Sequence, residues 1–265
     1  MPNSTHPQRF IFHGNATPFG ARIVSIDGKP AFDVVTGPPC TSLSVVGGHH
    51  RAESKGSRYK DIFSWGVTLA ESKGEVRADG HHITTVTASI ENVSAKNGPI
   101  EFFAEKLSIT TIADHTPNGQ PEIILTNTEF KGLKLDGKPV DVELDDDFSK
   151  FPTFAKFERE YQRNEDFYNK YQNRLTHGSG GAFGSKLPRT AGGHAGVSFI
   201  NSIRWNGKKT KGHVLALKGF GKIHFGEVLM KDNNRRGTLV RLAMGSSTGA
   251  DAAFPATDPN GSWGH

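Results

Sequence analysis

The chain has 265 residues, of which 35% are hydrophobic, and carries a formal net charge of +5 at pH 7. Its apolar stretches are short and interrupted, and none approaches the ~20 residues of a membrane-spanning helix. The excess of 32 basic over 27 acidic residues is modest, and the basic residues do not interleave with aromatic ones as in a single-strand-binding surface. We therefore expect no membrane span and no nucleic-acid partner.

The amino terminus and the single cysteine leave the compartment open. The first residues lack the basic start, apolar centre and small-residue cleavage site of a secretion signal. Cys40 has no second cysteine with which to form a disulfide, and its sequence neighbours supply no base that would activate it as a nucleophile. The localisation is accordingly left undetermined.

Three short turns along the chain predict β-hairpins. Apolar runs are interrupted at Asp27-Gly28, Asp136-Gly137 and Asn206-Gly207. Asp-Gly and Asn-Gly readily supply the two positive φ angles of a type I′ turn, whose twist matches the flanking strands. Between the first two turns, residues 85–90 alternate hydroxyl and apolar side chains, which is typical of a strand with one buried face.

The sequence period then changes from two to that of a helix. Residues 149–175 contain no glycine, and aromatic or leucine side chains recur at helical spacing at Phe154, Phe157, Tyr161, Tyr168, Tyr171 and Leu175. Ser149 is the expected N-cap, and Pro152 falls in the tolerant first turn. The pattern predicts one long amphipathic helix, which either packs its stripe on the β core or presents it to a partner.

These patterns predict a mainly antiparallel all-β fold, a β-sandwich or β-barrel of about ten to fourteen strands with one inserted helix. We expect a β-strand region over 1–147, the inserted helix over 148–177 and a glycine-rich loop or assembly arm over 178–196. Strands over 197–255 would complete the same domain, and residues 256–265 would form a flexible tail.

Charge is segregated along the chain. Asp145, Asp146 and Asp147 form an acidic cluster before the expected helix, whereas residues 204–241 are rich in basic side chains, including Arg235 and Arg236. Such clusters either join copies head to tail or lie on solvated faces. The aspartates lack the spacing of a calcium loop, and their position before a helix gives them a simpler electrostatic role, so calcium is only an alternative.

Histidine and tryptophan are the remaining candidates for a binding site. Neighbouring histidines in a strand point to opposite faces, so a metal site would combine separate residues, for which we select His81, His213 and His224. Trp65, Trp205 and Trp263 could stack on sugar rings, although core packing would explain most tryptophans and leaves Trp263 as the exception. We expect no obligatory cofactor.

No motif specifies a reaction. The glycine-rich segment 178–184 resembles a phosphate-binding loop, but it follows an expected helix instead of opening one. The sequence has no Walker lysine followed by serine or threonine, no GxSxG elbow and no HExxH pair. We assign no catalytic residue.

Several segments carry a family resemblance. They are residues 14–21 (GNATPFGA), 84–93, 130–139 (FKGLKLDGKP), 226–228 and 249–254 (GADAAF). In these segments the chain resembles the bacterial choice-of-anchor P type surface proteins. The resemblance implies an all-β envelope or surface component, secreted or at the cell surface, and implies no catalytic residues.

Three functional hypotheses follow. The first is a non-enzymatic structural or surface protein that self-associates into an oligomer or filament, through the aromatic helix face, the opposed charges or exposed strand edges. The second is a carbohydrate-binding module that uses the tryptophans. The third is a β-barrel enzyme with a histidine-based site.

Overall fold

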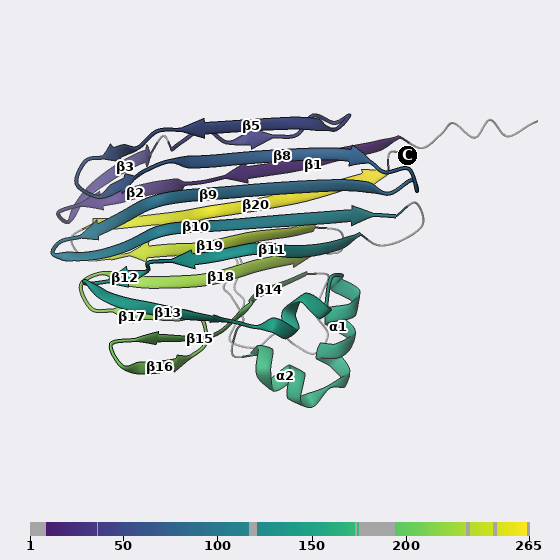
Figure 1. Ribbon diagram of the computed structural model, residues 1–265. Helices are drawn as coiled ribbons and strands as arrows, with labels where there is room; N and C mark the ends of the chain where they lie inside the picture. The colour runs from purple at the N-terminus through teal and green to yellow at the C-terminus, as the bar shows by residue number, and fades with distance from the viewer. Residues whose placement is uncertain are drawn as a thin grey trace, which may run out of the picture.

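Two antiparallel sheets lie face to face and make the body of the molecule (Figure 1). The computed structural model describes residues 9–35, 37–116, 121–172, 174, 194–231, 234–245 and 248–263. In these ranges neither sheet closes into a barrel, so the sandwich of the two predicted architectures is the one observed. The predicted all-β antiparallel class is confirmed.

The first sheet has nine strands, and β20 lies near its centre. The main path runs β14–β18–β19–β20–β1–β4, with β17 beside β18 and the β2–β3 hairpin beside β20. The strands are β1 (Phe10–Thr17), β2 (Gly20–Ile26), β3 (Lys29–Val35), β4 (Thr41–Ser42), β14 (His194–Ser198), β17 (Val214–Leu217), β18 (Gly221–Lys231), β19 (Asn234–Met244) and β20 (Thr248–Trp263).

The second sheet has eleven strands in the order β16–β15–β13–β12–β10–β9–β7–β6, with β11 beside β10, and β8 between β5 and β9. The strands are β5 (Gly48–Ser54), β6 (Ser57–Tyr59), β7 (Phe63–Trp65), β8 (Thr68–Val76), β9 (His82–Asn97), β10 (Ile100–His115), β11 (Glu122–Lys131), β12 (Lys134–Leu135), β13 (Lys138–Leu144), β15 (Ile200–Trp205) and β16 (Lys208–Lys211). The described residues thus hold more strands than the sequence predicted.

The three predicted hairpin turns have the expected backbone geometry. Both central residues have positive φ at Asp27-Gly28 (49° and 72°), Asp136-Gly137 (53° and 70°) and Asn206-Gly207 (48° and 75°). The turns connect β2 to β3, β12 to β13 and β15 to β16. Local turn chemistry therefore sets these three hairpins.

The core lies between the two sheets, where β20 packs on β9 and β10. Aromatic side chains from distant segments meet there: Phe19 stacks on Trp65 at a ring-centroid distance of 4.8 Å and on Phe254 at 5.7 Å. These rings and the aliphatic residues of β9, β10, β18 and β19 form one continuous buried cluster. Aromatic burial thus supplies much of the apolar contact in a chain of low hydrophobic content.

Residues 256–263 are a strand, and the prediction of a flexible tail from 256 is wrong up to Trp263. They are the second half of β20, and they pair with β1 from Phe10↔Trp263 to Thr17↔Ala256. The glycine, serine and proline residues of this stretch are atypical of a strand, and its pairing partner, β1, lies at the other end of the chain. Strand β14 likewise takes the last residues of the expected glycine-rich loop, of which residues 178–193 lie outside the described part of the chain.

The predicted long helix is divided into three shorter helices. A 3₁₀ helix spans Asp146–Lys150, α1 spans Phe154–Arg163 and α2 spans Glu165–Gln172. The N-cap of α1 is Thr153, whose hydroxyl accepts from the Lys156 N–H at 3.1 Å, and not the predicted Ser149. Asn164 ends α1 and its side chain accepts from the Phe167 N–H at 3.1 Å, so it starts α2. The helices lie together at one corner of the sandwich, near β13 and β14 (Figure 1).

Candidate functional site

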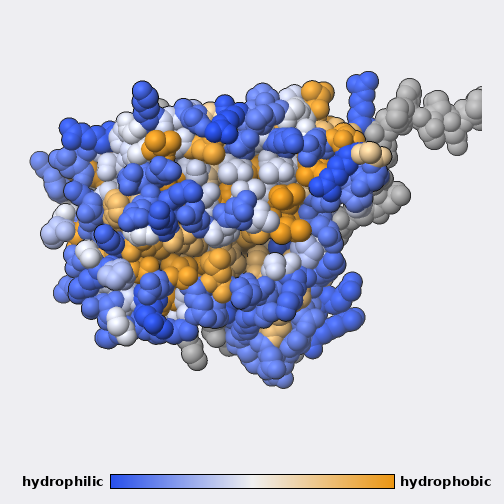
Figure 2. Space-filling model, viewed as in Figure 1, coloured by the Kyte–Doolittle hydropathy of each residue, from blue (hydrophilic) through white to orange (hydrophobic). Residues whose placement is uncertain are grey.

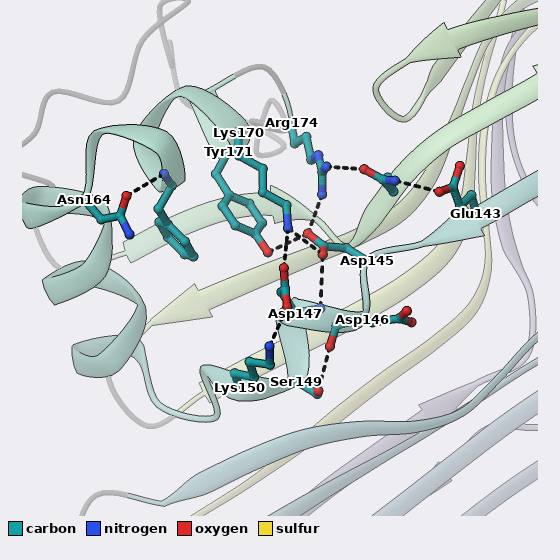
Figure 3. A network of polar contacts seen from close by, with 12 residues as sticks. Glu143, Asp145, Asp146, Asp147, Ser149, Lys150, Asn164, Lys170, Tyr171 and Arg174 are labelled. Atoms are coloured by element: carbon teal, nitrogen blue, oxygen red, sulfur yellow. Dashed lines mark hydrogen bonds and ion pairs between the residues drawn. The ribbon is translucent and has the colours of Figure 1, made fainter.

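A buried ion-pair network surrounds Asp145 (Figure 3). Its side chain is only 4% exposed and contacts Lys170 Nζ at 2.8 Å, while Tyr171 donates a hydrogen bond at 2.7 Å and the Arg174 guanidinium completes the shell. Burial raises the pKa of Asp145, but the hydrogen bonds from Lys170 and Tyr171 and the nearby Arg174 outweigh it and hold the pKa below its usual range. Asp145 is therefore an anchor that ties α2 to the 3₁₀ helix.

The other two aspartates lie at the surface of the same network. Asp147 pairs with Lys150 at 2.7 Å and with Lys170 at 3.1 Å, and these contacts lower its pKa to about 2. Asp146 is exposed. Because two of the three carboxylates already contact ammonium or guanidinium groups, the cluster does not present a set of free oxygens to calcium.

The acidic and basic segments meet within one copy of the chain. Glu143 contacts Lys209 Nζ at 2.8 Å and accepts from the Asn201 amide at 2.8 Å, and Asn201 in turn accepts from Arg174 at 2.6 Å. Arg235 is buried and donates to the Phe151 carbonyl, and burial lowers its pKa to about 10. Glu143, Lys209 and Arg235 are therefore engaged within their own chain and are not free for head-to-tail assembly.

The aromatic helix face is also used internally. Phe154, Phe157 and Tyr161 are buried, and the Phe157 ring lies 5.2 Å from the rings of both Phe167 and Tyr171. Tyr168 is half-buried against Tyr161. Of the two readings of this stripe, packing within the chain is the observed one, and these four side chains do not form an exposed docking face.

The three tryptophans do not share a surface. Trp65 is buried in the core beside Phe19, and Trp205 donates its indole N–H to the Leu135 carbonyl at 3.2 Å. Trp263 is half-buried at the end of β20, where its ring lies 5.2 Å from Phe10. The structure therefore does not assemble them into one sugar-stacking platform.

Two of the three selected histidines come together. His213 and His224 lie at the β17–β18 hairpin with ring centroids 6.1 Å apart, and Glu227 joins them so that one ligand atom of each residue lies within 4.8 Å of the others. His81 lies elsewhere and pairs with Asp114 at 2.8 Å. Two of the three predicted metal ligands thus lie close together, and Glu227, instead of His81, is the third residue beside them.

Strand β3 exposes two large apolar side chains, which we call the edge patch: Phe32 is 90% exposed and Val34 is 73% exposed. They lie two residues apart and so point from the same face of the strand. On the opposite face, Asp33 accepts a hydrogen bond from Tyr59 of the second sheet, which covers that side. In the described residues β3 pairs with β2 alone, so the patch lies at a sheet edge.

A second group of exposed valines, the turn patch, consists of Val45, Val46 and Val76. Val45 and Val46 lie in the turn before β5 and are 61% and 82% exposed, and Val76 ends β8 with 59% exposed. The Phe12 N–H donates to the Val45 carbonyl at 3.0 Å, which fixes the turn to β1. Figure 2 shows apolar surface at the same end, where β5 and β8 approach the start of β1.

Aromatic and histidine side chains fill the space at this end of the sandwich. The Phe10 ring lies 4.4 Å from His82, 4.9 Å from His115 and 5.2 Å from Trp263. Burial lowers the pKa of His115 to about 4 and also lowers that of His82. Both imidazoles are therefore neutral at pH 7, which lets them pack as apolar rings.

A polar cavity of about 360 Å³ opens where β1 and β4 meet the middle of β20. Its lining includes the exposed side chains of Cys40 and Arg236, together with Asn15 and Asp258. Arg236 thus remains at the surface, as do Asp146 and Asp147 of the predicted assembly set. No helix in the described part of the chain is both long enough and apolar enough to cross a membrane.

Comparison with known proteins gives a family but not an activity. A family described as "Domain of unknown function (DUF8256)" matches residues 10–186. The chain belongs to this family. No curated protein and no solved structure matches it. Strand β20, which follows the matched range, pairs with β1 and β2 inside that range, so the folded unit extends beyond residue 186.

Residues that the sequence reasoning passed over include the edge patch and Glu227. Pro30 is the second residue of β3, and proline is tolerated mainly in edge strands, so this signal could have marked β3 as an edge. The exposure of Phe32 could not be read from the alternation, because Ala31 and Val35 give the other face an apolar pattern as well. Glu227 joins the histidines only because of a backbone irregularity at Gly226.

Proposed function

We propose that the protein is a non-enzymatic structural β-sandwich that self-associates, with the edge patch of one copy docking on the turn patch of the next. The observation that carries the proposal is the exposure of Phe32 and Val34 on one face of an edge strand. Single exposed apolar residues are ordinary, but a phenylalanine and a valine together on an unpaired edge resemble an interface.

The positions of the two patches favour a head-to-tail contact. The edge patch can be located along β20 because Val34 pairs with Arg22, which in turn pairs with Asp251 of β20. The turn patch can be located in the same way, because the Val45 carbonyl accepts a hydrogen bond from Phe12, which pairs with Gly261 of β20. Asp251 and Gly261 are ten residues apart on one strand, which corresponds to about 33 Å. Two different surfaces at opposite ends make a heterologous contact, which repeats to give a ring or an open filament.

The expected strength of the contact is moderate. Burying a phenylalanine or valine side chain contributes about 1.5–3 kcal/mol, and the free edge of β3 adds backbone hydrogen bonds if it pairs with the second copy. Association also costs several kcal/mol of lost translational and rotational freedom. We therefore expect assembly that depends on protein concentration in the micromolar range.

The contact should depend little on salt. The sequence hypothesis of opposed charge clusters predicts weakening by salt, but Glu143, Lys209 and Arg235 bind partners in their own chain. Apolar burial is not screened by ions, and strongly hydrated salts strengthen it. Salt dependence thus separates the apolar contact from the charge contact.

The test is sedimentation velocity and light scattering of the full chain at several concentrations. The proposal predicts species larger than one copy, of 28.8 kDa, that grow with concentration and persist at high salt. A single-copy mass at every concentration would contradict it. Dissociation by salt would indicate an interface built from charges instead of the two patches.

A further inference from the structure

A histidine–carboxylate cluster lies away from both patches, at the hairpin of β17 and β18 (Figure 1). Val214 pairs with His224, so His213 is one residue from the position facing His224. The Phe225 N–H also donates to the His213 carbonyl at 2.9 Å, which fixes the backbone of His213 beside β18. The two imidazoles are held together by backbone pairing.

Gly226 brings the carboxylate of Glu227 to the same side. Before it, Ile223 and Phe225 are buried in the core, and after it Val228 and Met230 are buried, so the alternation shifts by one residue. The shift depends on Gly226, which has φ +58° and whose Cβ, if present, would lie 2.6 Å from the Ile200 side chain. His224 and Glu227 therefore point away from the core together although they are three residues apart.

The cluster has buried nitrogen atoms without hydrogen bonds. His213 and His224 are 4% and 8% exposed, and their Nδ1 atoms have no hydrogen-bond partner among the described residues. The nearest oxygen to His224 Nδ1 is Glu227 Oε1, at 3.3 Å in poor alignment. Buried polar atoms in native proteins normally have partners, so two unpaired imidazole nitrogens facing one carboxylate require an explanation.

Arg241 orients the carboxylate. Its Nε and Nη2 donate to Glu227 Oε2 and Oε1 at 2.6 Å and 2.8 Å. An ionised carboxylate has about four lone-pair positions, so two remain after this pairing. The guanidinium thus holds Glu227 in place as partners of metal ligands commonly do, while its charge limits the affinity for a cation.

We propose that His213, His224 and Glu227 bind a divalent transition metal of the zinc class. Two imidazoles and one carboxylate with an open fourth position suit zinc, and imidazole also suits iron, nickel and copper. In a tetrahedral site with bonds of about 2.1 Å the ligand atoms lie about 3.4 Å apart, so the present separations, all within 4.8 Å, close by side-chain rotation.

The first experiment titrates the metal-stripped full chain with Zn²⁺ by calorimetry and with Co²⁺ by visible absorption. We expect one ion per chain, a Kd for Zn²⁺ below about 10 μM, and the absorption of four-coordinate Co²⁺. A lack of heat and of Co²⁺ absorption overturns the proposal. Because the spectrum is recorded on the wild-type protein, this result does not depend on the folding of any variant.

The second experiment assigns the ligands. His213→Gln and His224→Gln should each weaken Zn²⁺ binding by at least about 100-fold, because even the loss of a partner of a ligand commonly costs up to that factor. His81→Gln is the matched control, since His81 pairs with Asp114 at a different position, and should leave binding unchanged. Circular dichroism verifies folding. If His81→Gln weakens Zn²⁺ binding, or if neither His213→Gln nor His224→Gln weakens it, the metal is bound elsewhere and the assignment is wrong.

Discussion

The two ends of β20 differ in how they present apolar surface. At the Thr248 end, β20 is flanked by β2 and β19. The edge patch at this end lies on β3, which pairs with β2. At the Trp263 end, the described chain gives β20 only β1 as a partner, and the turn patch is joined to β1 by the hydrogen bond from Phe12 to Val45 and to β9 by the pairing of Val76 with His82. The first surface is thus supported by strand pairing with β2 and the second by contacts with β1 and with His82 of β9.

Because their supports differ, the two patches should respond to different perturbations. On the opposite face of β3 from the edge patch, Asp33 accepts a hydrogen bond from Tyr59, and its carboxylate lies 4.0 Å from Lys60 Nζ. Val76 of the turn patch pairs with His82, which in turn pairs with His115, and burial holds the pKa of His115 at about 4. Substitutions at either patch should weaken assembly, whereas acid should act first on the turn patch.

The largest expected effect is at the edge patch. The double substitution Phe32→Glu and Val34→Glu removes two apolar contacts and would bury two charges, which should cost about 4 kcal/mol or more of association free energy, or about 1,000-fold in Kd. Both side chains are exposed, so the monomer should keep its unfolding midpoint. Sedimentation velocity measures the first quantity and urea unfolding the second. Unchanged association would remove β3 from the interface.

Val45→Glu with Val46→Glu tests the turn patch. Valine buries less area than phenylalanine, so we expect a smaller loss of about 3 kcal/mol in association. Val67→Glu is a matched control, since Val67 is half exposed and lies between β7 and β8, outside both patches. Equal effects of the control and the double variant would show that added negative charge, and not the turn patch, causes the loss.

The pH dependence of stability follows from His115. Unfolded histidine has a pKa near 6.5 and folded His115 about 4, so the unfolded chain binds a proton first as the pH falls. The free energy of unfolding should therefore decrease between about pH 6.5 and about pH 4, by up to about 3 kcal/mol for this residue. Folded Glu143, Asp147 and Glu227 have pKa values of about 2, below the ordinary values near 4 of an unfolded chain, so the stability that they contribute is lost mainly below about pH 4.5.

Urea unfolding across this pH range measures the effect. His213 has the same shift, so His115→Gln should remove about half of the slope and leave the rest. A slope that His115→Gln does not change would mean that His115 is not a buried neutral group. Assembly should weaken over the same range, because Val76 of the turn patch is joined to His115 through His82.

The smallest expected effect is that of salt. Between about 0.05 and about 0.5 M sodium chloride we expect the association constant to change by less than about threefold, because neither patch relies on an ion pair. A large loss would point to charges such as Arg236, which remains exposed near β1 and β4.

How much the sequence could predict depended on how local each feature is. The Asp27-Gly28 hairpin was predictable because a type I′ turn is determined by its own two residues. The helix break at Asn164 was missed although asparagine is a good N-cap, because the aromatic period continues across it. Strand β20 was missed beyond residue 255, because its pairing with β1 joins the two ends of the chain.

The candidate sites show the same limit. His213 and His224 could be selected because both fall in one short hairpin, but the contribution of Glu227 required the irregularity at Gly226. The exposure of Phe32 was beyond sequence reasoning, since phenylalanine is usually buried and only the fold shows which face of β3 is covered.

The most direct test of the proposed assembly mixes the two double variants. The edge variant, Phe32→Glu with Val34→Glu, keeps an intact turn patch, and the turn variant, Val45→Glu with Val46→Glu, keeps an intact edge patch. Each alone should sediment as one copy of 28.8 kDa, and an equimolar mixture should form a dimer of twice that mass and nothing larger. A mixture that stays monomeric, or a turn variant that dimerises alone, would contradict the head-to-tail contact.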